Sequence, residues 1–136
     1  QSRSSAASDV YKRQVEIGVL DCSIEEAIGK NYDGRVREFF MHGTSHSIGL
    51  DVHDVGVIKP NGDDDGRLLE PGMVLTVEPG LYFPKWVETL NIDPKFAGIG
   101  IRIEDDVLIT DGDPEVLTAS CPKTVVDIEN TVGKDV

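Results

Sequence analysis

The chain has few cysteines and no long hydrophobic run. Its two cysteines, Cys22 and Cys121, lie far apart without the CxxC spacing of redox and zinc motifs. A disulfide framework is therefore not expected, and the reducing cytoplasm suits this cysteine usage better. No apolar stretch approaches the roughly 18 residues that a transmembrane helix needs, so we expect no membrane partner.

Basic charge is also scarce. The chain has 136 residues, of which 13 are Lys or Arg and 25 are Asp or Glu, giving a formal net charge of -12. Nucleic acids and anionic lipids attract positively charged surfaces, so this balance argues against a nucleic-acid partner. The length suits one domain or part of a larger one.

The first residues differ in composition from the rest. Residues 1–14, QSRSSAASDVYKRQ, lack an initiator Met and the apolar core of a secretory signal. We interpret them as a non-native, adapter-like segment, with a piece of transit peptide as the weaker alternative. On this interpretation the domain occupies residues 15–136, and the native chain begins upstream of Val15.

Helix signals occur near both ends of residues 15–136. Ser23 followed by Glu26 is a capping-box pattern, which predicts a helix that begins there and stops at Gly29. Pro122 opens a second predicted helix, which Gly133 ends.

Strand signals fill the region between these helices. Residues 74–83, VLTVEPGLYF, predict two strands separated at Pro79-Gly80. Residues 99–109, IGIRIEDDVLI, predict one strand. Side chains alternate between the faces of a strand, so Arg102 and Glu104 would share one face.

All the histidines are concentrated in one short window. His42, His46 and His53 fall within twelve residues, and histidine is the commonest metal ligand and a frequent proton carrier. Gly43 and Gly49 oppose a helix here, so we predict a short strand, a tight turn and a second extended piece. A buried core strand with satisfied histidines is the alternative, and the window alone does not separate the two.

The residues in and after this window exclude some kinds of catalytic site and favour a metal site. The first two histidines have the i,i+4 spacing of a zincin, but Gly43 stands where that motif needs Glu. The serines of the window lack the G-x-S-x-G elbow of a hydrolase. One imidazole and two carboxylates carried by strands can converge on a metal. The candidates are His46, Glu78 and Glu104.

Three motifs, in order, resemble those of a known family. HGTSHSIGLDVHDVG, LEPGMVLTVEPGLYF and GIGIRIEDDVLIT are similar to motifs of the creatinase/aminopeptidase, or pita-bread, metallopeptidases. Within that superfamily, they and the ending LTASCPKTVVDIE look most like the Xaa-Pro aminopeptidase (aminopeptidase P) branch. The resemblance implies an α+β class and a pita-bread fold. Residues 15–136 would form its C-terminal half, a curved antiparallel sheet with flanking helices.

The resemblance also implies a site with two divalent metal ions, most often Mn²⁺, with Co²⁺ or Zn²⁺ as alternatives. The ions would be held by two Asp, one His and two Glu. The metal ligands implied in this chain are His46, Glu78 and Glu104. The catalytic residues implied are His42, His53, Arg102 and Glu78.

The implied reaction is hydrolysis of the bond between an N-terminal residue and a following proline. The implied partners are peptides with proline at the second position and, in the complete protein, further copies of the chain. Xaa-Pro dipeptidase (prolidase) and a non-catalytic pita-bread binding module are the alternatives, and the retained site residues favour an enzyme.

The two upstream metal-binding aspartates of the family have no counterpart in this chain. Asp21 and Asp33 are twelve apart but flank the predicted helix, so we interpret them as surface acids. We therefore expect the chain as written to be an inactive part of a catalytic domain.

Overall fold

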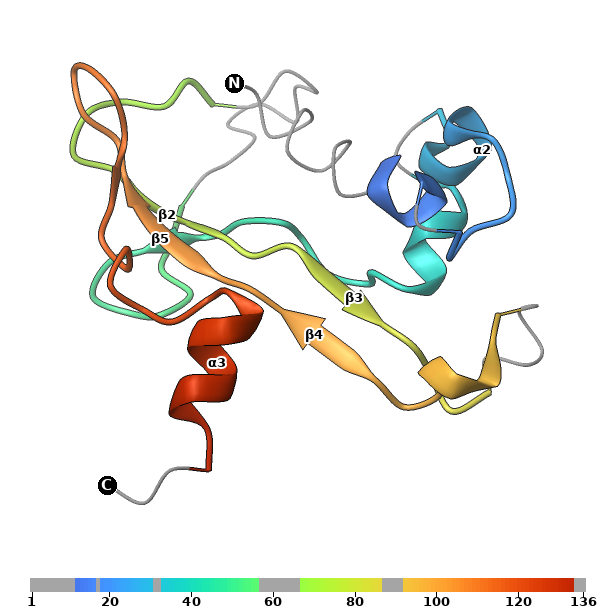
Figure 1. Cartoon of the computed structure of the whole chain (residues 1–136). Helices are drawn as coiled ribbons and strands as arrows, with labels where there is room; N and C mark the ends of the chain where they lie inside the picture. Colours follow the sequence, from blue (N-terminus) through green and yellow to red (C-terminus); the bar gives the residue numbers. More distant parts are fainter. Residues whose placement is uncertain (1–11, 17, 31–32, 57–66, 87–91, 134–136) are drawn as a thin grey trace. The chain divides into compact units, whose positions relative to one another are not determined.

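The computed structural model describes residues 12–16, 18–30, 33–56, 67–86 and 92–133. The chain divides into two compact units. Unit 1 comprises Gln1–Ser45 and Glu78–Arg102, and unit 2 comprises His46–Val77 and Ile103–Val136. Both units combine short helices with antiparallel strands, as an α+β class requires (Figure 1).

Unit 1 contains a two-stranded sheet and short helices. Strands β3 (Gly80–Tyr82) and β4 (Gly100–Arg102) pair in antiparallel fashion. The helical elements are α2 (Ile24–Ile28), the 3₁₀ helices η1 (Arg35–Glu38) and η3 (Pro94–Phe96), and a helical turn over residues 12–16.

The core of unit 1 forms around the aromatic residue that follows η1. Phe39 is fully buried, and its ring centroid lies 5.7 Å from that of Phe83. The same cluster contains the buried residues Val19, Leu20, Ala27 and Ile92. Phe39 also accepts a backbone hydrogen bond from Tyr82 at 2.8 Å, so the core is fastened directly to β3.

Unit 2 is built on a four-stranded antiparallel sheet in the order β1-β2-β5-β6. The strands are β1 (Ser47–Ile48), β2 (Val74–Val77), β5 (Asp105–Leu108) and β6 (Glu115–Val116). Helix α3 (Val125–Thr131) follows the last strand. Strand β2 is central, with Leu75 opposite Ser47 on one side and opposite Val107 on the other.

Both predicted helices are present. Helix α2 has Ser23 as its N-cap with a complete capping box to Glu26, and it ends at Gly29 with a φ of 72°. That left-handed conformation favours glycine. Helix α3 begins later than predicted, because the Thr124 side chain accepts a hydrogen bond from the Asp127 N–H and acts as its cap.

The single strand predicted over residues 99–109 is wrong. The structure has two strands there, β4 and β5, which belong to different sheets. Strand β4 pairs with β3, and β5 pairs with β2. The β2–β3 segment is interrupted at Glu78 and Pro79, and proline has no N–H for a ladder hydrogen bond. The opposite segment, β4 and β5, is interrupted at Ile103 and Glu104.

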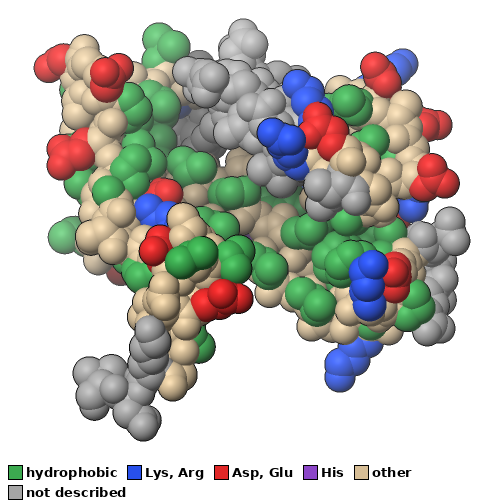
Figure 2. Space-filling view, in the orientation of Figure 1, with side chains coloured by type: hydrophobic (Ala, Val, Ile, Leu, Met, Phe, Trp, Pro, Cys, Tyr) green, Lys and Arg blue, Asp and Glu red, His purple; other side chains and the backbone are tan. Residues whose placement is uncertain are grey.

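The described surface carries many hydrophobic side chains among the charged ones (Figure 2). Leu50 and Val55 are almost completely exposed, and Val125 and Val132, at the two ends of α3, are each 72% exposed. These two valines therefore lie outside the core. Among the described residues, no helix is long and apolar enough to cross a membrane.

Candidate metal and catalytic site

The Glu78 carboxylate lies between two cationic or polar side chains of unit 1. Glu78 is only 6% exposed, and its backbone N–H donates to the Thr44 carbonyl at 2.9 Å. Its Oε2 atom is 3.6 Å from an Arg102 guanidinium nitrogen and 3.7 Å from His42 Nδ1. A buried carboxylate needs such neighbours, because an unpaired charge inside a protein is costly.

The Tyr82 hydroxyl links the two neighbours of Glu78. Arg102 Nε donates to Tyr82 Oη at 2.7 Å, and Tyr82 Oη is 2.6 Å from His42 Nε2. His42 Nδ1 lies 2.7 Å from the Gly43 carbonyl, which can only accept, so Nδ1 carries the proton in that bond. In a neutral His42 the Nε2 atom then accepts from the Tyr82 O–H. The result is one directed chain of hydrogen bonds that orients the imidazole and the guanidinium beside Glu78.

Sequence reasoning did not single out Tyr82. The signal available in the sequence was its position four residues after Glu78, in a predicted strand. Tyr82 pairs with Gly100, and a Cβ at Gly100 would lie 3.1 Å from the Tyr82 ring. The missing side chain at Gly100 therefore leaves room for the tyrosine ring.

Unit 2 brings together a histidine and a carboxylate with the spacing of metal ligands. A ring nitrogen of His46 and a carboxylate oxygen of Glu104 lie within 4.8 Å of each other. His46 Nδ1 is 3.1 Å from the Ser47 carbonyl. By the same argument Nδ1–H is the donor in that bond, so Nε2 is the ring nitrogen that carries the lone pair in a neutral His46. The His53 ring meets the His46 ring edge to face, with centroids 4.1 Å apart.

The segment after Glu104 is anchored within unit 2. Lys123 Nζ lies 2.5 Å from Asp105 Oδ1, and Thr118 Oγ1 donates to the same oxygen at 2.6 Å. The hydrogen bond from Lys123, followed by that from Thr118, lowers the pKa of Asp105 below its ordinary value. The start of β5, directly after Glu104, is thus held by two side chains.

The structure groups the predicted site residues unit by unit. Unit 1 joins Glu78, His42 and Arg102, and unit 2 joins His46, Glu104 and His53. The donors of unit 2, one imidazole and one carboxylate, fit a divalent transition metal. Shared use of one metal centre by His46, Glu78 and Glu104 remains a prediction, as do the catalytic roles.

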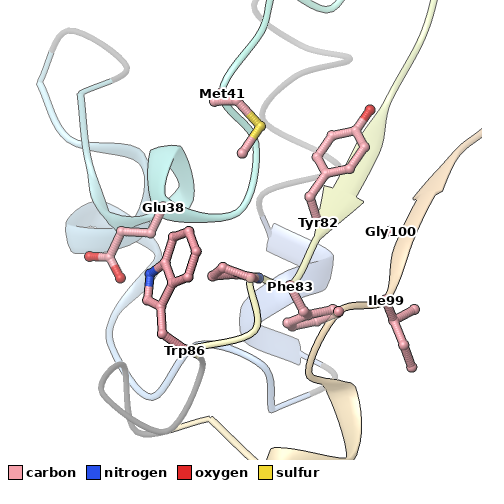
Figure 3. A pocket seen from close by; sticks show the side chains of 9 residues that line it. Glu38, Met41, Tyr82, Phe83, Trp86, Ile99 and Gly100 are labelled. Carbon is pink, nitrogen blue, oxygen red and sulfur yellow. The ribbon is translucent and has the colours of Figure 1, made fainter.

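Unit 1 also contains an open apolar pocket beside Tyr82 (Figure 3). Its volume is about 470 Å³. The side chains of Met41, Phe83, Trp86 and Ile99 line it, with Glu38 as its charged member. This lining suits an apolar group better than a charged one.

Comparison with known proteins identifies the class. The chain belongs to metallopeptidase family M24, whose model matches residues 3–111. It is 52% identical over 115 residues to Xaa-Pro aminopeptidase of Escherichia coli K12, covering 85% of this chain and 24% of that protein. It is 44% identical over 119 residues to Xaa-Pro aminopeptidase of Haemophilus influenzae, covering 88% of this chain and 26% of that protein.

Solved structures agree with these relatives. E. coli aminopeptidase P with the inhibitor Pro-Leu matches with a TM-score of 0.75 and 48% identity, covering 90% of this chain and 26% of that one. The Zn-substituted E. coli enzyme in complex with product matches equally well, with the same coverage. The predicted α+β pita-bread class is therefore confirmed. The chain spans about a quarter of the length of these relatives.

The interpretation of residues 1–14 stays a prediction. The family match includes residues 3–14. Gln14 is buried, and its carbonyl accepts backbone hydrogen bonds from Val19 and Leu20 at 2.9 and 3.1 Å. Residues 1–11 lie outside the described part of the chain.

Proposed function

We propose that the chain forms the C-terminal part of the catalytic site of a dinuclear Xaa-Pro aminopeptidase. The observation that carries this proposal is the buried Glu78 carboxylate between Arg102 and His42. It is supported by the His46–Glu104 pair and by the similarity to Xaa-Pro aminopeptidases. In this proposal His46, Glu78 and Glu104 are metal ligands, and two further aspartates come from sequence beyond these 136 residues.

The metals are proposed to be divalent ions, preferably Mn²⁺, with Co²⁺ or Zn²⁺ as alternatives. When bound, such a pair of ions would lower the pKa of a coordinated water and polarise the scissile carbonyl. Carboxylate-rich ligation with one imidazole suits these metals.

The residues of this chain then have separate tasks. Glu78 accepts a proton from the attacking water, and the Arg102 guanidinium, 3.6 Å from its Oε2, orients the Glu78 carboxylate. His53 donates a hydrogen bond to the substrate carbonyl oxygen as it gains negative charge, and His42, whose ring nitrogens bond the Gly43 carbonyl and the Tyr82 hydroxyl, borders the Glu78 carboxylate on the side facing the substrate. Tyr82 holds His42 and Arg102 in the orientations that these tasks require.

The proposed substrates are peptides with proline at the second position, cleaved before that proline. The complete protein is proposed to act in the cytoplasm as a homo-oligomer, with no nucleic-acid or membrane partner.

The experiment uses a chimera in which residues 15–136 replace the matching stretch of E. coli Xaa-Pro aminopeptidase. The purified chimera is loaded with Mn²⁺ and assayed with an X-Pro-Y tripeptide, an X-Ala-Y tripeptide and an X-Pro dipeptide. We expect cleavage of X-Pro-Y only, loss of that activity in Glu78→Gln, and normal activity in the control Glu115→Gln, which alters an exposed carboxylate on β6.

Three outcomes would contradict the proposal. Cleavage of X-Pro dipeptides alone would indicate a prolidase. Metal binding without cleavage would indicate a non-catalytic module. Full activity of the isolated 136-residue chain with Mn²⁺ would show that no further ligands are required.

A further inference from the structure

Thr76 contacts His46 through both its main chain and its side chain. Thr76 lies in the middle of β2 and is 0% exposed. Its N–H donates to the His46 carbonyl at 2.9 Å. Its Oγ1 accepts the His46 N–H, also at 2.9 Å. One buried residue therefore binds both backbone polar groups of His46.

This arrangement departs from a regular antiparallel ladder. In the hydrogen-bonded pairs of such a ladder, two opposite residues exchange both main-chain hydrogen bonds. Beside His46, a side-chain oxygen takes the place of the second carbonyl acceptor. Among the residues that suit a central strand, threonine combines a β-branched shape with a hydroxyl acceptor.

The contact between Thr76 and His46 lies at the end of the β1–β2 pairing. His46 immediately precedes β1, whose two residues pair with Val74 and Leu75. The two bonds with Thr76 extend this ladder to His46. The ring of His46 is held separately, by its Nδ1–H bond to the Ser47 carbonyl. Backbone and ring of the proposed ligand are thus both set by atoms of unit 2.

We propose that Thr76 is a positioning residue for the metal ligand His46. Its hydroxyl fixes the His46 backbone so that the imidazole is in place before an ion arrives. This rests on the proposed function, in which His46 binds metal. Groups that orient a ligand in this way typically affect metal affinity 10–100-fold.

The test compares three variants. Thr76→Val keeps the branched shape and removes the hydroxyl. Thr76→Ser keeps the hydroxyl and removes the methyl group. Thr110→Val is the matched control, because the Thr110 hydroxyl also accepts a backbone N–H, from Gly112 at 3.0 Å, in the turn after β5.

Two quantities are measured. Mn²⁺ affinity is determined by calorimetry on the chimera, at matched folded fractions. Backbone hydrogen exchange at His46 is followed by NMR on the metal-free 136-residue chain. We expect Thr76→Val to weaken Mn²⁺ binding at least about tenfold and to speed exchange at His46 by a similar factor. Thr76→Ser and Thr110→Val should stay within about twofold of the parent for both.

The outcomes separate this proposal from the function on which it rests. Unchanged Mn²⁺ affinity or unchanged His46 exchange in Thr76→Val overturns the positioning role alone. Equal losses in Thr76→Ser and Thr76→Val overturn it too, since shape and not the hydroxyl would then matter. A parent chimera that binds no ion overturns the ligand role of His46 and the positioning role with it.

Discussion

Replacing Tyr82 by Phe removes a single oxygen atom and keeps the ring. That oxygen joins Arg102 and His42 at 2.7 and 2.6 Å, and both of these side chains lie beside the Glu78 carboxylate. A hydrogen bond contributes about 0.5–1.5 kcal/mol net, and more when one partner is charged. The Arg102 side chain is 43% exposed. Its hydrogen bond to Tyr82 therefore contributes near the lower end of this range, because water competes for the guanidinium.

Together the two bonds are worth about 2 kcal/mol, which corresponds to a loss of roughly 30-fold in kcat/KM. In the chimera, Tyr82→Phe should therefore cleave X-Pro-Y peptides about 10–30-fold more slowly, with Mn²⁺ affinity within about twofold of the parent. The loss falls on catalysis because Tyr82 is not a metal ligand. Steady-state kinetics and calorimetry on the same preparation measure both quantities.

A double-mutant comparison sharpens this prediction. Arg102→Gln breaks the bond between Arg102 and Tyr82 from the other side. The two substitutions share that interaction, so the double variant should lose less than the product of the single losses. Parent-like activity of Tyr82→Phe, strictly multiplicative losses, or loss of metal in Tyr82→Phe would each refute the reasoning.

Three further predictions follow. In the chimera, His53→Ala should lower kcat about 100-fold and leave the metal content unchanged, whereas Glu104→Ala should lose metal. Elemental analysis measures the metal content of both variants. Equal metal loss in both would contradict the assigned roles. Phe39→Ala should lower the free energy of unfolding of unit 1 by about 3–5 kcal/mol in urea titrations, because Phe39 is fully buried; a loss below about 1 kcal/mol would contradict that core. Hydrogen bonds from the backbone and then the side chain of Ser23 lower the pKa of Glu26. Ser23→Ala removes the side-chain bond and keeps the backbone one, so it should raise that pKa part of the way to its ordinary value in an NMR titration, and no change would argue against the side-chain bond.

The lowered pKa of Glu26 determines the pH range in which this carboxylate stabilises the folded chain. The folded-state pKa of Glu26 is depressed, so its stabilising effect is present above the unfolded pKa and is lost as pH falls through the folded value. Ser23→Ala brings the two pKa values closer together. The acid-dependent part of unfolding should therefore be smaller in the variant.

Local signals predicted the elements whose cause is local. The capping box at Ser23 and the glycine that ends α2 are both present, since a few neighbouring residues decide them. The break at Pro79 was also predicted, because a missing N–H is visible in the sequence. The break at Ile103 and Glu104 was not, because nothing in that alternating stretch shows that its two halves pair with different strands.

Some residues of the candidate site could be predicted from the sequence and others could not. Residue type identified His46, Glu78 and Glu104 as candidate ligands, and motif similarity added His42, His53 and Arg102. Tyr82 and Thr76 were missed, since their roles depend on contacts with residues 40 and 30 positions away. Those contacts follow from strand register, which the periodicity of one segment does not determine.

The most direct test of the account is to locate the metals by anomalous scattering in crystals of the Mn²⁺-loaded chimera. Two Mn²⁺ peaks are expected, with His46, Glu78 and Glu104 among their ligands. Peaks coordinated by other residues, or a folded chimera with no ion at His46, would contradict it.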